Sequence, residues 1–299
     1  MTQHNNNIII NTALQFSDLS TQTTAWTGAV TFPSIASSAT TATSTSNQIV
    51  LIADNGQRPA YYSTTASQYL YVGTDKPVYT PPSNSPPLTD YIAWYDASSV
   101  NLGSSLWTDK SINGNNATIY GSPTLQSGTG NGATATFNAL SSNDHTTDAV
   151  LFPGELIDNS HYTLFTLSRW NGSNKGWIVG DEGPGSNEEF SSGHRDANSG
   201  VAYHNGFVNA YGNWFGDNWV ISADSNNFYR PNGSTAKQGT GGSSGGINHF
   251  GINYRGIQGY APSDWQTAEV IIYDRVLSGT EIAATETYLA TKYGITLVG

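Results

Sequence analysis

The chain has 299 residues, of which 37% are hydrophobic, 12% aromatic and 11% charged. The hydrophobic and aromatic content excludes a disordered chain, and the low charge together with 32 glycines favours strands and turns. Its 11 basic and 22 acidic residues give a formal net charge of -11, which would repel phosphate backbones and anionic membranes and so argues against nucleic acid as a partner. The sequence has no cysteine, which excludes disulfides, thiolate metal sites and a cysteine nucleophile.

The first part of the chain is polar. Residues 1–7 precede only three isoleucines, too few for the apolar segment of a signal peptide, so we expect a protein without an export signal. We also expect no membrane insertion, because no apolar run is long enough to span a bilayer. Residues 1–47 combine short apolar runs with Ser/Thr-rich stretches and are predicted to be an extended arm.

Residues 48–75 are predicted to be a small β meander. Segments 48–53 and 59–63 read as strands joined by a hairpin turn at Asn55-Gly56, because Asn-Gly readily adopts the positive φ pair that such a turn requires. Residues 68–72 read as a third strand. Such a meander is marginal alone, so we expect it to assemble with copies of itself, as a trimer, or with another protein.

Residues 76–90 are predicted to be a spacer. Five prolines fall between positions 76 and 87, with Ser and Asn among them. Proline fixes φ and lacks an amide donor, so this stretch should be extended and semi-rigid. It is the predicted boundary before a domain at 91–299.

That domain consists of short apolar runs separated by Gly, Asn and Asp turns, for example 163–169, 218–223 and 268–273. This spacing is typical of an all-β sandwich or jelly roll.

One helix is predicted at the C-terminal end. Ser278 and Glu281 have the spacing of a capping box, and Gly294 provides the stop. The apolar side chains recur at helical intervals, and we expect this stripe to close one edge of the sandwich: Ile282, Leu289 and Tyr293, with Ala283 and Ala290 beside it.

Motifs at both ends of the domain carry a family resemblance. Residues 91–98 (YIAWYDAS), 106–111 (LWTDKS) and 113–118 (NGNNAT) resemble the first strands of laminin-G-like, concanavalin A-like lectin/glucanase domains. Residues 268–278 (AEVIIYDRVLS) and 288–294 (YLATKYG) are similar to the last strand and helix of that family. The resemblance implies two stacked antiparallel sheets over 91–299, in a family whose members bind glycans, bind proteins or cleave polysaccharides.

The hydrolytic branch implied by this resemblance carries paired carboxylates in an E-x-D-x-x-E pattern, because two carboxylates must flank one glycosidic bond. That pattern is absent, and the nearest acids, Asp181-Glu182 and Glu188-Glu189, lie in a Gly/Pro/Ser/Asn stretch. Residues 241–245 spell G-x-S-x-G but lack a following helix. The sequence therefore does not predict an enzyme.

A calcium site is a further possibility, because hard cations prefer oxygen ligands at loop ends and some laminin-G-like domains hold Ca²⁺ there. Asp96, Asp109 and Asp274 fall within the matched motifs and are the candidate ligands. The alternative for Asp109 is that it organises a turn with Asn113 through bonds to the backbone.

The stretch 203–229 mixes aromatic rings with amide and carboxylate groups, the combination that recognises the faces and hydroxyls of sugars. The alternative is that the rings fill the core, and we expect about half of them to do so. Gly212 and Gly216 place Tyr211, Asn213 and Trp214 in a turn, so we expect these three residues to be exposed. The predicted carbohydrate-binding residues are Tyr211, Asn213, Trp214 and Asp217.

These observations predict a virion-associated fibre, spike or decoration protein of a bacteriophage. The lectin-like domain would bind a host-surface glycan, and the N-terminal region, whose hairpin at 48–63 is similar to small modules of phage structural proteins, would bind other virion proteins. Such a chain would be made in the host cytoplasm and displayed on the virion's outer surface. The alternatives are a polysaccharide-cleaving hydrolase of the same fold and a purely structural capsid or tail protein.

Overall fold

A computed structural model describes most of the chain beyond residue 84 and the backbone of six short strands before it. The described residues are 85–154, 156–157, 161–181, 189–226, 228–242 and 250–299, with the strands between residues 14 and 71. The chain divides into two compact units, Met1–Tyr79 and Thr80–Gly299. In the described part, no helix is both long and apolar enough to cross a membrane.

The first unit contains two small sheets. Strands β1 (Leu14–Gln15) and β2 (Thr21–Gln22) pair with each other. The other sheet has the order β3-β4-β5-β6, with antiparallel pairing of β4 to β5 and of β5 to β6, as the predicted meander requires. The hairpin turn at Asn55-Gly56, most of the arm at 1–47 and spacer residues 76–84 lie outside the described residues. The bounds of this sheet are Ser34–Ile35, Ile49–Ile52, Arg58–Ser63 and Gln68–Tyr71.

The second unit has an eight-stranded antiparallel sheet with the order β17-β16-β15-β20-β13-β10-β9-β8. Adjacent strands come from distant parts of the sequence, because β20 lies between β13 and β15. The bounds are Val100–Asn101 for β8, Leu106–Trp107 for β9, Ala117–Tyr120 for β10, Ala149–Leu151 for β13, Val179–Asp181 for β15, Phe190–Arg195 for β16, Asn198–His204 for β17 and Phe250–Ile252 for β20.

A seven-stranded antiparallel sheet stacks against it, with the order β11-β12-β21-β14-β18-β19. The seventh strand, β7, lies on the same side of β21 as β12. The first half of β21 pairs with β12, and its second half pairs with β7. The bounds are Ala93–Asp96 for β7, Thr124–Ser127 for β11, Asn138–Ser141 for β12, Thr163–Lys175 for β14, Val220–Ser225 for β18, Phe228–Pro231 for β19 and Ser263–Tyr273 for β21.

Both faces of the central strands of the seven-stranded sheet are buried, because alternate residues of these strands enter different apolar clusters. Val270 and Ile272 of β21 belong to the cluster between the two sheets. Ile271 and Tyr273 belong to a second cluster on the outer face. Two antiparallel sheets around a shared core confirm the predicted all-β sandwich.

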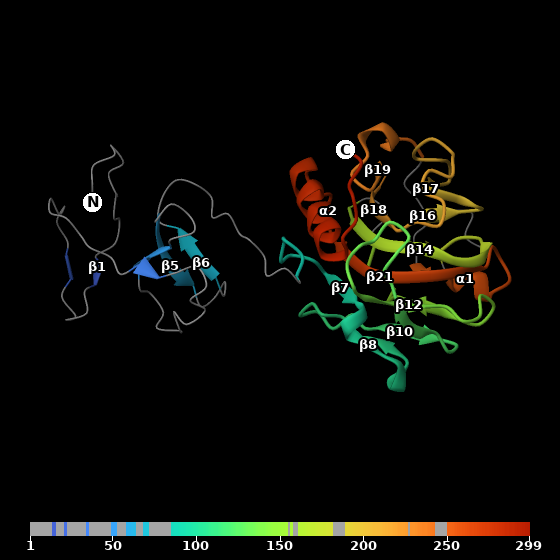
Figure 1. Cartoon of the computed structure of the whole chain (residues 1–299), viewed down its shortest axis with the longest axis horizontal. Helices are drawn as coiled ribbons and strands as arrows, with labels where there is room; N and C mark the ends of the chain where they lie inside the picture. Colours follow the sequence, from blue (N-terminus) through green and yellow to red (C-terminus); the bar gives the residue numbers. More distant parts are fainter. Residues whose placement is uncertain are drawn as a thin grey trace. The chain divides into compact units, whose positions relative to one another are not determined.

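The C-terminal helix α2 (Gly279–Tyr293) covers that outer face, along β18 and β21 (Figure 1). Its predicted ends are confirmed: Ser278 and Glu281 form a capping box, and Gly294 takes a left-handed conformation with φ of 66°. The prediction that the helix closes an edge is wrong, because its buried stripe packs on the face of the sheet, and Ala283 is exposed. A second, single-turn helix, α1 (Tyr254–Ile257), follows β20.

Candidate functional site

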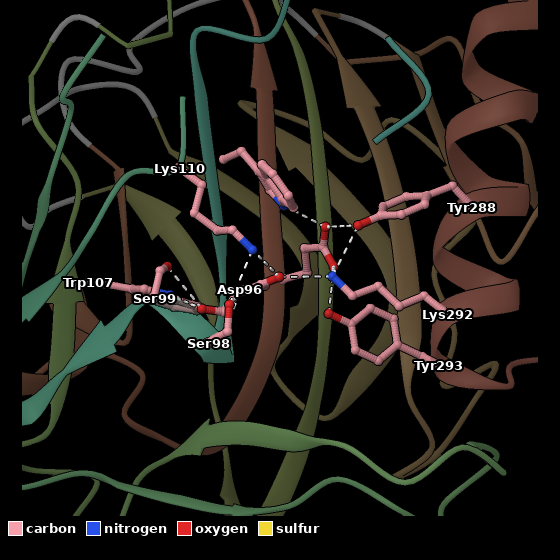
Figure 2. Close-up of polar contacts among 10 residues, drawn as sticks. Asp96, Ser98, Ser99, Trp107, Lys110, Tyr288, Lys292 and Tyr293 are labelled. Atoms are coloured by element: carbon pink, nitrogen blue, oxygen red, sulfur yellow. Dashed lines mark hydrogen bonds and ion pairs between the residues drawn. The ribbon is translucent and has the colours of Figure 1, made fainter. Parts of the chain in front are cut away.

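The motifs at the two ends of the domain meet in a buried polar network beneath α2 (Figure 2). At its centre is Glu269 of β21, whose side chain is fully buried. Its carboxylate accepts hydrogen bonds from Trp94 Nε1 at 2.7 Å, Tyr288 Oη at 2.8 Å, Lys292 Nζ at 2.7 Å and Tyr293 Oη at 2.5 Å. A buried carboxylate is tolerated only when it is paired and hydrogen-bonded, so these donors fix the helix on the sheet.

Asp96 is the second carboxylate of this network. Its oxygens contact Lys110 Nζ at 2.8 Å, Lys292 Nζ at 3.0 Å and Ser98 Oγ at 2.5 Å. Burial by itself would raise the pKa of Asp96, but the charge of Lys292 and the hydrogen bonds from Lys110 and Ser98 outweigh it and lower the pKa to about 2. Two ammonium groups therefore already occupy the position that a cation would need.

The predicted calcium ligands are not brought together. Asp109 accepts bonds from the backbone amides of Trp94, Ser111 and Asn115 at 2.8 to 2.9 Å, which is the turn-organising role named as its alternative. Asp274 is exposed after the end of β21. Among the described residues, no group of three or more acidic or histidine side chains could hold a metal ion, so the structure assembles no calcium site from Asp96, Asp109 and Asp274.

The acidic residues weighed as hydrolytic candidates form ion pairs where they are described. Asp181 contacts Arg255 Nη1 at 2.9 Å, and Glu189 contacts Arg195 Nη2 at 2.7 Å and Arg255 Nη2 at 3.4 Å. Glu182 and Glu188 lie outside the described residues, as does the end of the 241–245 motif.

The aromatic stretch at 203–229 divides between core and surface. Trp219 and Tyr229 are 1% and 0% exposed, whereas Tyr211 and Trp214 are 63% and 43% exposed. The remaining rings are of intermediate exposure: Tyr203, Phe207, Phe215 and Phe228. The two rings predicted to lie on the surface are therefore on the surface.

The turn that carries Tyr211 and Trp214 is held from within. Asn213 Oδ1 accepts hydrogen bonds from Ser199 Oγ at 2.7 Å and from the amide of Gly216 at 3.1 Å. The Trp214 ring packs against Gly212, where an added Cβ would lie 2.8 Å from the ring. Of the four predicted binding residues, two present exposed rings and Asn213 shapes the turn.

Asp217, the fourth predicted residue, forms an ion pair with Lys175 at 2.7 Å, and half of its side chain remains exposed. The pair links this turn to the end of β14. Exposed pairs of this kind contribute little to stability.

Sequence reasoning missed a further cluster of aromatic and arginine side chains. Arg195 at the end of β16 lies 3.9 Å from the ring centroid of Trp177 and 3.7 Å from that of Tyr203 on β17. Arg255 of α1 lies 4.3 Å from the Trp177 centroid and 6.0 Å from that of Tyr260. Rings and guanidinium groups thus alternate, and we call this set the aromatic–arginine strip: Tyr203, Arg195, Trp177, Arg255 and Tyr260.

The strip continues into the exposed turn. Tyr203 packs edge-on against Phe207, with centroids 5.1 Å apart, and Phe207 packs edge-on against Tyr211 at 5.0 Å. Tyr211 is therefore the outermost ring of a contiguous row rather than an isolated side chain. The row depends on strand register, which the sequence does not reveal: Ser191 of β16 pairs with Tyr203 of β17 on one side and with Gly180 of β15 on the other.

Comparisons with known proteins give weak similarity. No protein-family model matches the sequence, and no curated protein matches it. Among solved structures, Trypanosoma rangeli sialidase in complex with sialic acid has a TM-score of 0.47 and 16% identity over 70% of this chain. The match spans about a third, 34%, of the sialidase.

Two other solved structures are similar to the same degree. Domain 4 of a Geobacillus stearothermophilus arabinanase, in complex with arabinotriose, has a TM-score of 0.47 and 17% identity, over 66% of this chain and 98% of that domain. The binding domain of Paraclostridial Mosquitocidal Protein 1 has a TM-score of 0.43 and 14% identity, over 69% of this chain and 55% of that one. Because these similarities are weak, the function proposed below rests on the residues of this chain.

Proposed function

We propose that the second unit is a carbohydrate-binding module whose ligand stacks on the exposed rings of Tyr211 and Trp214. The observation that carries this proposal is that two of the three exposed aromatic rings among the described residues lie on one short turn; the third is Tyr260. Sugars present apolar ring faces, and an exposed aromatic ring buries such a face at low entropic cost because it has few rotatable bonds.

The turn is also suited to binding because it is already ordered. Asn213 and Ser199 hold its backbone through the bonds described above, so binding would not have to order a flexible loop. Asp217 follows the two rings closely in the sequence, and half of its side chain is exposed. Its carboxylate can accept hydrogen bonds from sugar hydroxyls.

The setting we propose is a bacteriophage virion. The second unit would bind host-surface glycan, and the region at 1–75 would attach the chain to the particle as a homotrimer. The proline-rich sequence at 76–90 supports this arrangement, because an extended spacer would carry the binding unit away from the attachment region.

A hydrolase is the second candidate. The observation that favours it is that Asp181 and Glu189 contact the same guanidinium group, that of Arg255, which brings two carboxylates close together. Both are neutralised by ion pairs, which does not suit a general acid that must hold a proton. Release of reducing ends from host polysaccharide, lost in Glu189→Gln, would establish this activity.

The binding proposal is tested on the full chain with a glycan array and an adsorption assay on host cells. The double variant Tyr211→Ala, Trp214→Ala should lose detectable binding while its melting curve stays close to that of the parent. Ile112→Ala is the matched control, because its side chain is fully exposed elsewhere, on the turn at 111–114. Unchanged binding in the double variant would contradict the proposal.

A further inference from the structure

We infer that the aromatic–arginine strip extends the binding surface, and that the ligand is an uncharged glycan chain of several linked sugars rather than a single terminal sugar. This inference rests on the proposed carbohydrate-binding function. It concerns the class of ligand, and it assigns Tyr260, which sequence reasoning did not select, as a second contact.

The first argument is the length of the surface. The row of rings begins at Tyr211, crosses β17 and β16, passes Trp177 before β15, and ends at Tyr260, which follows α1. In the sheet order β17-β16-β15, the part of that path from Tyr203 to Trp177 covers two strand spacings of about 4.8 Å, roughly 10 Å, and Tyr211 and Tyr260 lie beyond its two ends. A single sugar ring is too short to reach both ends of such a path.

The second argument is where the rings are accessible. Tyr211 and Tyr260, at opposite ends of the row, are 63% and 48% exposed, whereas Trp177 in the middle is 5% exposed. Sugar rings can therefore stack on Tyr211 and on Tyr260, at two separate points of the row. A chain with several rings can engage both, and the second contact then benefits from the high effective concentration that the first one creates.

The third argument is rigidity. Trp177 lies over Gly180, where an added Cβ would be 3.3 Å from the ring and 2.9 Å from the Phe190 carbonyl oxygen. Its Nε1 donates to Asp196 at 3.1 Å. The guanidinium groups of Arg195 and Arg255 are held in turn by Glu189. The strip is thus preorganised, which lowers the entropic cost of binding a long ligand.

The fourth argument is charge. The two guanidinium groups of the strip contact three carboxylates, because Asp196 also lies 3.5 Å from Arg195 Nε, alongside Asp181 and Glu189. The side chains of Asp196 and Glu189 are 56% and 38% exposed. Three carboxylates against two guanidinium groups leave a net negative charge that would repel an acidic sugar, whereas the hydroxyls of a neutral sugar can donate hydrogen bonds to the exposed carboxylate oxygens.

The experiment measures binding of the full chain to graded series of oligosaccharides, from the disaccharide upward. The neutral series are malto-, cello-, xylo- and galacto-oligosaccharides, and the acidic series are oligogalacturonates and sialylated chains. Affinity should rise with length in a neutral series and then reach a plateau, and acidic chains of equal length should bind more weakly.

Two variants locate the effect. Tyr260→Ala should remove the gain from length, lowering affinity for long chains roughly threefold to tenfold, or about 0.6 to 1.4 kcal/mol, while short chains bind as before. Tyr211→Ala should weaken short and long chains alike. Asp196→Asn removes one exposed charge and keeps the Oδ1 acceptor for Trp177, so it should improve the binding of acidic chains relative to neutral chains of equal length.

The outcomes separate this inference from the proposed function. Glycan binding that is independent of length, that prefers acidic chains, or that is insensitive to Tyr260→Ala would overturn the inference and leave the proposed function standing. Absence of binding to every series and to host cells would overturn both. Ile112→Ala is the control, and melting curves of each variant exclude loss of fold as the cause.

Discussion

Two polar clusters of the same domain differ in origin and in exposure. The network around Glu269 is built from residues of the two terminal motifs and is buried beneath α2. The aromatic–arginine strip uses residues outside those motifs. Its middle ring, Trp177, is buried, and the row of rings reaches the surface at its two ends, Tyr211 and Tyr260. The comparison shows that the residues that carry a family resemblance can be those that maintain the fold, while the residues available to a ligand lie elsewhere.

The largest effect is expected from breaking the buried network. Lys292→Ala removes the ammonium group that bridges Asp96 and Glu269, and leaving such carboxylates uncompensated should cost about 3 to 5 kcal/mol. Lys175→Ala is the matched control, because its pair with Asp217 is exposed and should contribute about 0 to 1 kcal/mol. Denaturant unfolding measures both. Equal losses in the two variants would show that the network has no special structural role.

The second prediction separates core rings from surface rings in the stretch 203–229. Trp219→Ala should cost about 3 to 5 kcal/mol, because the side chain is buried and its removal leaves a cavity. The double variant Tyr211→Ala, Trp214→Ala should cost about 1 kcal/mol or less, since these rings are exposed. Thermal melting of the three proteins decides, and a large loss in the double variant would reject the idea of a free aromatic platform.

The third prediction concerns the pH dependence of the network. Because the pKa of Asp96 is lowered from 3.8 to about 2 in the folded state, its ionised form stabilises the fold above pH 4, and that contribution, roughly 2 kcal/mol, should be lost as the pH falls toward about 2. Asp96→Asn should flatten this part of the stability curve relative to the parent. A curve of unchanged slope in the variant would contradict the ion pairing of Asp96.

Glu281, another carboxylate with a lowered pKa, serves as the comparison. The hydrogen bond from Arg275, with those from Ser278, lowers the pKa of Glu281 from 4.5 to about 2. Glu281 lies at the N-terminus of α2, and its ion pair with Arg275 is partly exposed, so water screens it. Glu281→Gln should therefore change the slope of stability against pH less than Asp96→Asn does.

The smallest effect is expected from cutting the spacer near Pro82. The fragment after the cut should be a soluble monomer with the same melting transition as in the full chain, because its sheets and helix close one core. The fragment of residues 1–75 should not fold as an isolated monomer, since its short strands bury too little surface to offset the entropy of ordering. A sharp monomeric spectrum of this fragment would contradict the second part.

The sequence predicted the elements whose causes are local. The capping box at Ser278 and Glu281, the stop at Gly294 and the pairing of the meander strands all follow from side chains within a few residues of each other. The exposure of Tyr211 and Trp214 was predictable for the same reason, because flanking glycines indicate a turn. Local hydrogen bonding and backbone preference need no knowledge of the rest of the chain.

Tertiary structure decided what depends on strand order and register. Nothing near Asp96 in sequence indicates that Lys292 would pair with it, so a carboxylate that suggested a calcium ligand is instead part of an ion-pair network. Nor does the sequence place Trp177, Arg195 and Arg255 together, since β20 enters the sheet beside β15 from more than sixty residues away. Contacts of this kind form only when distant strands become neighbours, and composition and periodicity carry no information about which strands those are.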